Sequence, residues 1–174
     1  MSITKATKAD IPDLVNLVNS AYRGEDAKKG WTNEADLLVG GIRIDADEME
    51  EMMADEDHII LKHESGNKIT ACVSLVKKEN YLYLGMLTVS PELQGTGMGK
   101  KLLQSAEDFA KNEKFDRIRM TVITARQELI DWYTRHGYAD TGERLPFPYE
   151  PGKGEPSQRL EFMILEKAGL MANF

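Results

Sequence analysis

Residues 94–100 of the chain read QGTGMGK, and this short stretch decides how the rest of the sequence is interpreted. It follows an apolar, strand-like run at residues 81–89 and leads into a segment with helical periodicity. Its three glycines leave backbone N–H groups open to an anion, and the N-terminus of the following helix adds partial positive charge at the same place. Strand, glycine turn and helix together therefore predict a phosphate-binding loop.

Two well-known phosphate-binding motifs do not fit this loop. A P-loop has Gly, four residues and then Gly-Lys-Ser/Thr, but Gln94 occupies the first glycine position and Lys101 the Ser/Thr position. A dinucleotide-binding G-x-G-x-x-G motif read from Gly95 has Lys100 in place of its third glycine. The pattern that does fit is Gln-x-x-Gly-x-Gly. A glycine-rich turn that only caps a helix is the alternative without a ligand.

On this pattern the chain resembles the GCN5-related N-acetyltransferase (GNAT) superfamily, whose Arg/Gln-x-x-Gly-x-Gly/Ala loop holds the pyrophosphate of acetyl-coenzyme A. The expected element order, β-α-α-β-β-β-α-β-α-β-β, is also similar to that family, so the resemblance covers nearly the whole chain. It implies an α/β (α+β) fold. In that fold a mixed central sheet of about six to seven strands, with splayed parallel strands 4 and 5, is flanked by about four helices. It also implies a single N-acetyltransferase domain over residues 1–174.

The periodicity of apolar residues supports this order. It predicts strands at residues 3–8, 58–62, 68–77, 81–89, 115–123, 138–144 and 159–167. Helical spacing predicts an N-terminal helix with Tyr22 in its apolar stripe, a helix after the glycine loop, and a helix at about 126–136. The crossover helix after the glycine loop implies that the two strands it connects are parallel. Gly85, inside one of these strands, indicates a bulge or a close approach to the backbone.

The bulk properties exclude several classes of protein. Of 174 residues, 41% are hydrophobic and 29% are charged, as expected for a soluble globular protein. The formal net charge of −7 argues against nucleic acid as a partner. There is no apolar run long enough for a membrane span and no signal-peptide pattern. The only cysteine, Cys72, cannot form an intrachain disulfide, so a cytoplasmic location is expected. A homodimer is compatible with these properties.

The acidic residues are concentrated in one segment. Between Asp45 and Asp57, eight of thirteen residues are acidic, with Met49, Met52 and Met53 among them. One interpretation is a solvated helix whose methionines face the core. The other is a negatively charged rim that attracts a cationic amine substrate.

Acetyl transfer from a thioester to an amine requires an anchored donor, a hydrogen-bond donor for the developing oxyanion, a neutral amine and a proton for the departing thiolate. In the family, the strand that matches residues 81–89 binds the pantetheine arm through its backbone, like an added strand. The resemblance therefore implies main-chain contacts from Leu87, Thr88 and Val89, with an N–H near Leu87 facing the thioester carbonyl. The loop residues implied to hold the pyrophosphate are Gln94, Gly95, Thr96, Gly97, Met98, Gly99 and Lys100.

One tyrosine is the candidate for the leaving-group acid. Residues 128–138, ELIDWYTRHGY, resemble a family block in which a helix carries a tyrosine four residues before Gly-Phe/Tyr. The matching residue is Tyr133, and the resemblance implies that its phenol lies near the coenzyme sulfur, where it can donate a proton. The alternative is a core tyrosine with a structural hydroxyl. The family often has an asparagine seven residues earlier; Arg126 stands there instead, and it could bind the coenzyme or point to solvent.

The general base is not assigned by the sequence. Some family members carry a glutamate where this chain has Tyr83, so Glu34, Asp36 and Glu143 remain candidates. The acceptor is expected to be a primary amine of a small molecule or a peptide, bound by the segment after the first helix and by the proline-rich residues 145–158. Its candidate contacts are Arg23, Trp31, Glu34, Arg43, Phe147 and Tyr149.

Two of these arginines, Arg23 and Arg43, could pair with a substrate carboxylate or simply lie at the surface. The three histidines show no metal-ligand spacing, so no metal is expected. The sequence thus predicts an acetyl-coenzyme A-dependent acyltransferase. A module of the same fold that binds acetyl-coenzyme A as a sensor or scaffold, without turnover, is the alternative.

Overall fold

The computed structural model describes residues 3–22, 38–39, 43–93, 95–148, 152–156 and 159–172. Its main sheet has seven strands in the order β1-β3-β4-β5-β6-β9-β7. These strands are β1 (Ile3–Lys5), β3 (His58–Ser65), β4 (Lys68–Lys77), β5 (Leu82–Val89), β6 (Ile118–Ile123), β7 (Ala139–Pro146) and β9 (Glu161–Lys167). The helices are α1 (Ile11–Tyr22), α2 (Ala46–Ala54), α3 (Met98–Asn112) and α4 (Gln127–Arg135), with 3-10 turns at Lys8–Asp10 and Pro91–Leu93. This confirms the predicted mixed sheet flanked by helices.

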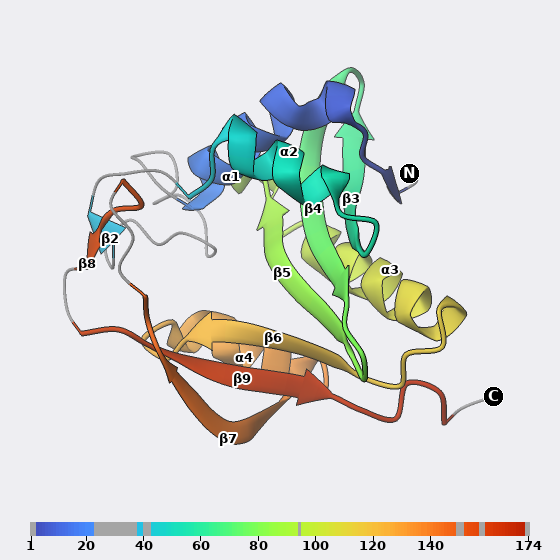
Figure 1. The fold of residues 1–174 in the computed structure, drawn as a ribbon, viewed down its shortest axis with the longest axis vertical. Helices are drawn as coiled ribbons and strands as arrows, with labels where there is room; N and C mark the ends of the chain where they lie inside the picture. The colour runs from blue at the N-terminus through green and yellow to red at the C-terminus, as the bar shows by residue number, and fades with distance from the viewer. Residues whose placement is uncertain are drawn as a thin grey trace.

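The fourth and fifth strands of the main sheet, β5 and β6, are its one parallel pair in the described part of the chain. They pair only at Leu82 with Ile118 and at Tyr83 with Arg119. Beyond these residues the two strands diverge, as Figure 1 shows at the centre of the molecule. The predicted splay is therefore confirmed, and residues 84–89 of β5 have no backbone partner on β6.

A bulge distorts β5 within the splayed region. The pairing of β4 with β5 shifts register between Cys72 and Ser74, and Met86 has a left-handed backbone with φ of 53°. A left-handed residue in a bulge redirects the neighbouring backbone groups out of the ladder. The sequence had indicated Gly85 for this distortion, but the left-handed residue is the next one along.

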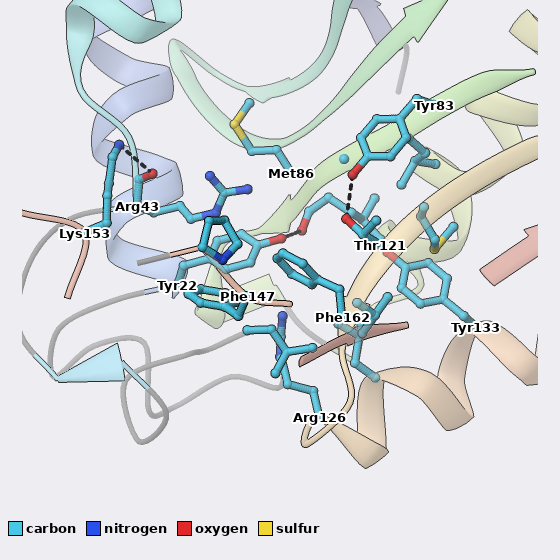
Figure 2. Close-up of a pocket in the computed structure, with 18 of the residues that line it drawn as sticks. Tyr22, Arg43, Tyr83, Met86, Thr121, Arg126, Tyr133, Phe147, Lys153 and Phe162 are labelled. Atoms are coloured by element: carbon cyan, nitrogen blue, oxygen red, sulfur yellow. Dashed lines mark hydrogen bonds between the residues drawn. The ribbon is translucent and has the colours of Figure 1, made fainter. Parts of the chain in front are cut away.

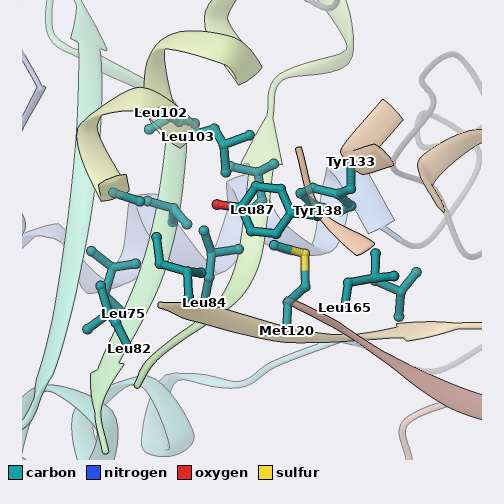
Figure 3. Packing of buried hydrophobic residues seen from close by; sticks show 14 of the residues in the cluster. Leu75, Leu82, Leu84, Leu87, Leu102, Leu103, Met120, Tyr133, Tyr138 and Leu165 are labelled. Carbon is teal, nitrogen blue, oxygen red and sulfur yellow. The ribbon is translucent and has the colours of Figure 1, made fainter. Parts of the chain in front are cut away.

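Helices cover both faces of the sheet. Alternate residues of β4 point to opposite sides: Val73 and Leu75 pack with α3, whereas Cys72 packs with α1. Figure 3 shows Leu102 and Leu103 of α3 above the leucines of β4 and β5. Burying each such side chain contributes about 1.5–3 kcal/mol, so these stripes hold the helices on the sheet.

The acidic segment forms α2, and its methionines face inward. Met49 is completely buried in the cluster with α1, and Met52 and Met53 pack against the same cluster. The carboxylate of Asp45 accepts a hydrogen bond from the N–H of Glu48 at 2.8 Å and caps the helix. The first of the two interpretations, a solvated helix with a methionine stripe on the core, is the one the structure favours.

Several boundaries differ from the sequence expectation by a few residues: β1 ends at Lys5 rather than 8, and β3 continues to Ser65 rather than ending at 62. β6 begins at Ile118 rather than 115, because the N–H of Phe115 bonds to the carbonyl of Ala110 and closes α3. The proline-rich residues 145–158 contain the end of β7, an edge strand that tolerates Pro146, and the short strand β8 (Glu155–Pro156). β8 pairs antiparallel with β2 (Leu38–Val39), so this part of the proline-rich segment lies beside residues 38–39. Over the described ranges, the helices include none with the length and apolar character that a membrane span requires.

Candidate functional site

The divergence of β5 from β6 opens a cavity of about 260 Å³. We call it the splay cavity, and Figure 2 shows its interior. The described residues that line it are Tyr22, Arg43, Glu48, residues 83–87 of β5, residues 120–123 of β6, Arg126, Leu129, Tyr133, Phe147, Pro148, Lys153, Gly154 and Phe162. Residues from segments as far apart in the sequence as α1 and β9 therefore meet at this cavity.

A second cavity of about 490 Å³ lies at the glycine loop, between the start of α3 and the outer face of α4. We call it the glycine-loop cavity. It is lined by Val89, Leu93, Gly95, Gly97, Gly99, Lys100, Glu128, Asp131, Trp132 and Arg135. Since Leu87 lines the first cavity and Val89 the second, the stretch of β5 that diverges from β6 connects them.

The glycine loop presents backbone amides. Gly97 is the N-cap of α3 in a left-handed conformation with φ of 86°, and the first main-chain bond of the helix runs from the N–H of Lys101 to the carbonyl of Gly97. Within the described residues, no backbone carbonyl accepts the N–H groups of Gly97, Met98 or Gly99. Unpaired N–H groups at a helix N-terminus are the donors that an anion requires.

The other predicted loop residues take different places. Lys100 lines the glycine-loop cavity. The hydroxyl of Thr96 donates to the carbonyl of Leu93 at 2.5 Å and closes the turn, while the side chain of Met98 is buried in the core. Both can therefore offer only their backbones to a ligand. Gln94 lies outside the described residues.

One backbone carbonyl of β5 already accepts a hydrogen bond from another side chain of the protein. The hydroxyl of Tyr22 donates to the carbonyl of Leu87 at 2.6 Å. Thr88 is completely buried and its hydroxyl donates to the carbonyl of Met86 at 2.9 Å, so its side chain faces away from both cavities. Tyr22 is buried in the core cluster of α1, as expected; its hydroxyl in addition supports the splayed strand, which its helical spacing alone did not reveal.

Tyr133 lies on α4 with 4% of its surface exposed. Its ring packs edge-on against Trp132 and Tyr138, with centroids 5.1 and 5.8 Å away. Its hydroxyl makes no hydrogen bond with the described residues, and Figure 2 shows it directed toward the splay cavity. Burial raises the pKa of Tyr133 well above its ordinary value, although the positive charge of Arg126 acts in the opposite direction. The phenol therefore stays protonated at neutral pH.

A second tyrosine bridges the two strands at the root of the splay. The hydroxyl oxygen of Tyr83 lies 2.6 Å from that of Thr121, just beyond the last paired residues. Tyr83 stands where some family members have a glutamate, and a phenol in a hydrogen bond does not replace a carboxylate base. Glu143 is exposed on β7 and lines neither cavity, so it is a poor candidate for the base.

Two arginines flank Tyr22 in the splay cavity. The guanidinium carbons of Arg43 and Arg126 lie 5.5 and 5.7 Å from the centroid of the Tyr22 ring. Arg126 thus lies in the splay cavity and is not among the residues that line the glycine-loop cavity. Phe147 also lines the splay cavity, packed on Phe162 with ring centroids 5.0 Å apart.

Four other predicted substrate residues lie outside the described ranges. These are Arg23, Trp31, Glu34 and Tyr149. Asp36, a candidate base, also lies outside them. Sequence reasoning missed Glu48 and Lys153, which are ion-paired in the splay cavity. The acidic run around Glu48 was a signal for this position, whereas nothing in the sequence linked it to Lys153.

The histidines and the cysteine have structural partners. His58 and His63 bond to the hydroxyls of Ser74 and Thr70, and no group of His, Cys, Asp and Glu in the described ranges is arranged to hold a metal. Cys72 is completely buried, and burial raises the pKa of its thiol to about 12. A thiol in that environment is unreactive at neutral pH.

Comparison with known families identifies the class. A family model described as an acetyltransferase (GNAT) domain matches residues 39–147, more than half of the chain. The chain therefore belongs to the GNAT acetyltransferase family. It is 25% identical over 149 residues to an uncharacterized N-acetyltransferase of Methanocaldococcus jannaschii. The match covers 80% of this chain but only 61% of that protein.

Solved structures of low sequence identity share the fold. The ribosomal-protein-S18-alanine N-acetyltransferase of Escherichia coli superposes with a TM-score of 0.71 at 14% identity, over 97% of this chain and 93% of that one. The PaiA N-acetyltransferase of Thermoplasma acidophilum, solved in complex with coenzyme A, gives a TM-score of 0.67 at 16% identity, over 97% and 99% of the two chains. These matches confirm the predicted fold.

Proposed function

We propose that the protein transfers the acetyl group of acetyl-coenzyme A directly to a primary amine of a small molecule or a peptide. The observation that carries the proposal is the stretch of β5 that diverges from β6. It runs from the open amides of the glycine loop to the cavity that the Tyr133 hydroxyl faces. Membership of the GNAT family and the coenzyme A complex of the Thermoplasma relative support the same donor.

The chemical groups of acetyl-coenzyme A favour one orientation across the two cavities, with the diphosphate at the glycine loop and the thioester in the splay cavity. Its diphosphate requires hydrogen-bond donors, and the N–H groups of Gly97 and Gly99 at the start of α3 supply them. Its arm is an extended chain with amides, which suits the edge of β5 that diverges from β6 at Leu87 and Thr88. Acetyl-coenzyme A supplies an activated acyl group at the end of this arm, and that end belongs in the splay cavity.

In this arrangement the protein contributes two catalytic elements. The backbone of β5 at the bulge around Met86 is turned out of the ladder, so its N–H groups are available to the oxygen on which negative charge develops. The phenol of Tyr133 remains protonated, and it can donate to the departing sulfur. Burial also raises the pKa of the coenzyme thiol, which favours formation of its S–H bond as the O–H bond of the phenol breaks; the phenolate then regains, through water, the proton that the amine has lost.

The amine must attack in its neutral form, and no carboxylate dedicated to this step stands in the described lining of the splay cavity. Glu48 lines it but is ion-paired with Lys153. The positive charges of Arg43 and Arg126 disfavour a bound ammonium and therefore lower the pKa of the amine. Deprotonation through water is sufficient under these conditions.

The test is acetyl-coenzyme A consumption over a panel of primary amines, with the native protein and Tyr133→Phe. We expect kcat to fall about 100-fold or more in the variant, as for the loss of a general acid, with unchanged affinity for coenzyme A. Tyr81→Phe is the matched control, because Tyr81 contacts Arg119 and lines neither cavity. Equal rates in the native protein and Tyr133→Phe would remove the role of Tyr133. Coenzyme A binding without turnover of any amine would favour the sensor or scaffold.

A further inference from the structure

The charge of the splay cavity is opposite to that of the protein. The chain carries a formal net charge of −7. The described lining of the cavity nevertheless contains three cationic side chains, Arg43, Arg126 and Lys153, and one carboxylate, Glu48. We call the three cationic residues the cationic wall. A cavity that concentrates positive charge in an acidic protein selects a ligand by its charge.

The contacts within the wall determine which cation faces a ligand. Lys153 is ion-paired with Glu48, and its Nζ also donates to the carbonyl of Arg43 at 3.1 Å. The one carboxylate of the described lining is therefore engaged by Lys153. No carboxylate of the described residues is ion-paired with the guanidinium of Arg43.

Arg43 is held in place from two sides. Its N–H donates to the side-chain oxygen of Asn19 on α1 at 2.8 Å, and its carbonyl accepts from Lys153. Its guanidinium lies 5.5 Å from the ring of Tyr22, whose hydroxyl is anchored on β5. A guanidinium stacked on an aromatic ring keeps its N–H edge for a planar or tetrahedral anion. Figure 2 shows Arg43 and Arg126 on the same side of the cavity, around Tyr22.

The diphosphate of the donor does not account for this wall. In the proposed arrangement it lies at the glycine loop, where Lys100 and Arg135 line the other cavity. The thioester end of the donor is uncharged. An amine without further charges would be repelled as an ammonium by Arg43 and Arg126 and would gain nothing from them as a neutral molecule.

We propose that the acceptor is an amine that also carries an anionic group, a carboxylate or a phosphate, and that Arg43 binds this group beside Arg126. The inference rests on the proposed acetyl transfer. Two parts of the cavity then bind two parts of the acceptor. The anionic group is bound at the cationic wall around Tyr22, and the amine of the same molecule points toward Tyr133. The positive wall also keeps that amine neutral, which the attack requires.

The test compares acceptors that differ only in charge. The panel consists of ω-amino acids with their amides and of aminoalkyl phosphates with their aminoalcohols, each assayed for acetyl-coenzyme A consumption. We expect kcat/KM to be about 10- to 100-fold higher for the anionic member of a pair, because a charge-assisted bond is lost in the other. The anionic series with the higher kcat/KM shows whether the cavity prefers a carboxylate or a phosphate.

Two variants test whether the cationic wall causes the preference for anionic acceptors. Arg43→Gln should lower kcat/KM for the anionic acceptor about 10-fold or more, through KM, and should lower it much less for the neutral member, so that the preference for the anionic acceptor is lost. Arg144→Gln is the control, since Arg144 is exposed on β7 and pairs with Asp140. Equal rates for charged and neutral acceptors would overturn the inference while leaving acetyl transfer intact.

Absence of turnover with every acceptor would contradict the proposed function, and a binding measurement then decides the inference separately. Calorimetric titration of the same ω-amino acids and aminoalkyl phosphates should show saturable binding that Arg43→Gln weakens about 10-fold. Binding that is absent, or equal in the native protein and the variant, would overturn the anionic acceptor.

Discussion

The two cavities of this protein are built in different ways. The glycine-loop cavity takes its donors from the backbone of consecutive residues at the start of α3. The splay cavity takes its polar groups from side chains on distant segments, such as Glu48 and Lys153, which are 105 residues apart in the sequence. A site made of local backbone groups can bind a co-substrate that a whole family shares. The side chains of a site assembled from distant segments can change without disturbing that backbone site.

The largest effect that separates the two cavities should come from Gly97→Glu. Gly97 has a φ of 86°, which strains any L side chain, and a carboxylate there would oppose a bound diphosphate. We expect the dissociation constant of coenzyme A to rise about 100-fold, from strain of about 1–3 kcal/mol plus charge repulsion. Isothermal titration with coenzyme A measures this change.

Gly142→Glu is the matched control for that variant. Gly142 has a φ of 89°, and as at Gly97 no heavy atom lies within 4 Å of an added Cβ, but it is on the edge strand β7. It should lower the melting temperature by a similar amount with no change in coenzyme A affinity. If both variants bind coenzyme A as the native protein does, the diphosphate is not held at the glycine loop.

The next effect concerns pH and the splay cavity. We expect kcat to rise about tenfold per pH unit below the pKa of the bound amine, since only the neutral amine attacks. Because the pKa of Tyr133 is raised above its ordinary 10.0, its donor form persists and no descending limb should occur below pH 10. Tyr133→Phe should lower the whole profile without changing its shape. A descending limb near pH 8 that disappears in this variant would contradict the protonated phenol.

The difference between the cavities also explains how much the sequence could predict. The strands, the crossover helix and the glycine loop followed from periodicity and from one contiguous motif, and the structure has them within a few residues. Local backbone chemistry needs only neighbouring residues, so QGTGMGK was sufficient to predict open amides at Gly97. The burial of Met49 and the C-terminal Gly137 of α4 were predictable for the same reason.

The splay cavity was less predictable because its contacts are non-local. The hydrogen bond from Tyr22 to Leu87 joins residues 65 apart, and helical spacing shows only that Tyr22 faces inward. The position of Arg126 beside Tyr22 depends on how α4 meets α1 across the splay. Gly85 indicated the bulge, but Met86 carries the left-handed backbone, because the register shift and not glycine content sets its place.

A smaller effect should distinguish the hydroxyls of Tyr22 and Tyr133, two of the three tyrosines that line the splay cavity. Tyr22→Phe leaves the carbonyl of Leu87 without its partner, and an unsatisfied buried group costs about 1–3 kcal/mol of unfolding free energy. Tyr133→Phe removes a hydroxyl with no hydrogen bond in the described part, so its stability should change by less than about 0.5 kcal/mol. Urea denaturation of both variants measures this contrast. Unchanged stability together with lost turnover in Tyr22→Phe would make Tyr22 the acid instead.

The smallest effect should come from the root of the splay. Thr121→Val keeps the branched shape of the side chain and removes its hydrogen bond to Tyr83, which should cost about 1 kcal/mol. Thr141→Val, which removes a bond to the carbonyl of Ile164 on the edge of the sheet, is the control. Because the ladder at Leu82 and Tyr83 already fixes where the strands separate, we expect acceptor KM to change less than about threefold in both variants. Acceptor KM could instead rise more than threefold in Thr121→Val but not in Thr141→Val, at equal stability of the two variants. That result would mean that the Thr121 hydroxyl on β6 binds the substrate.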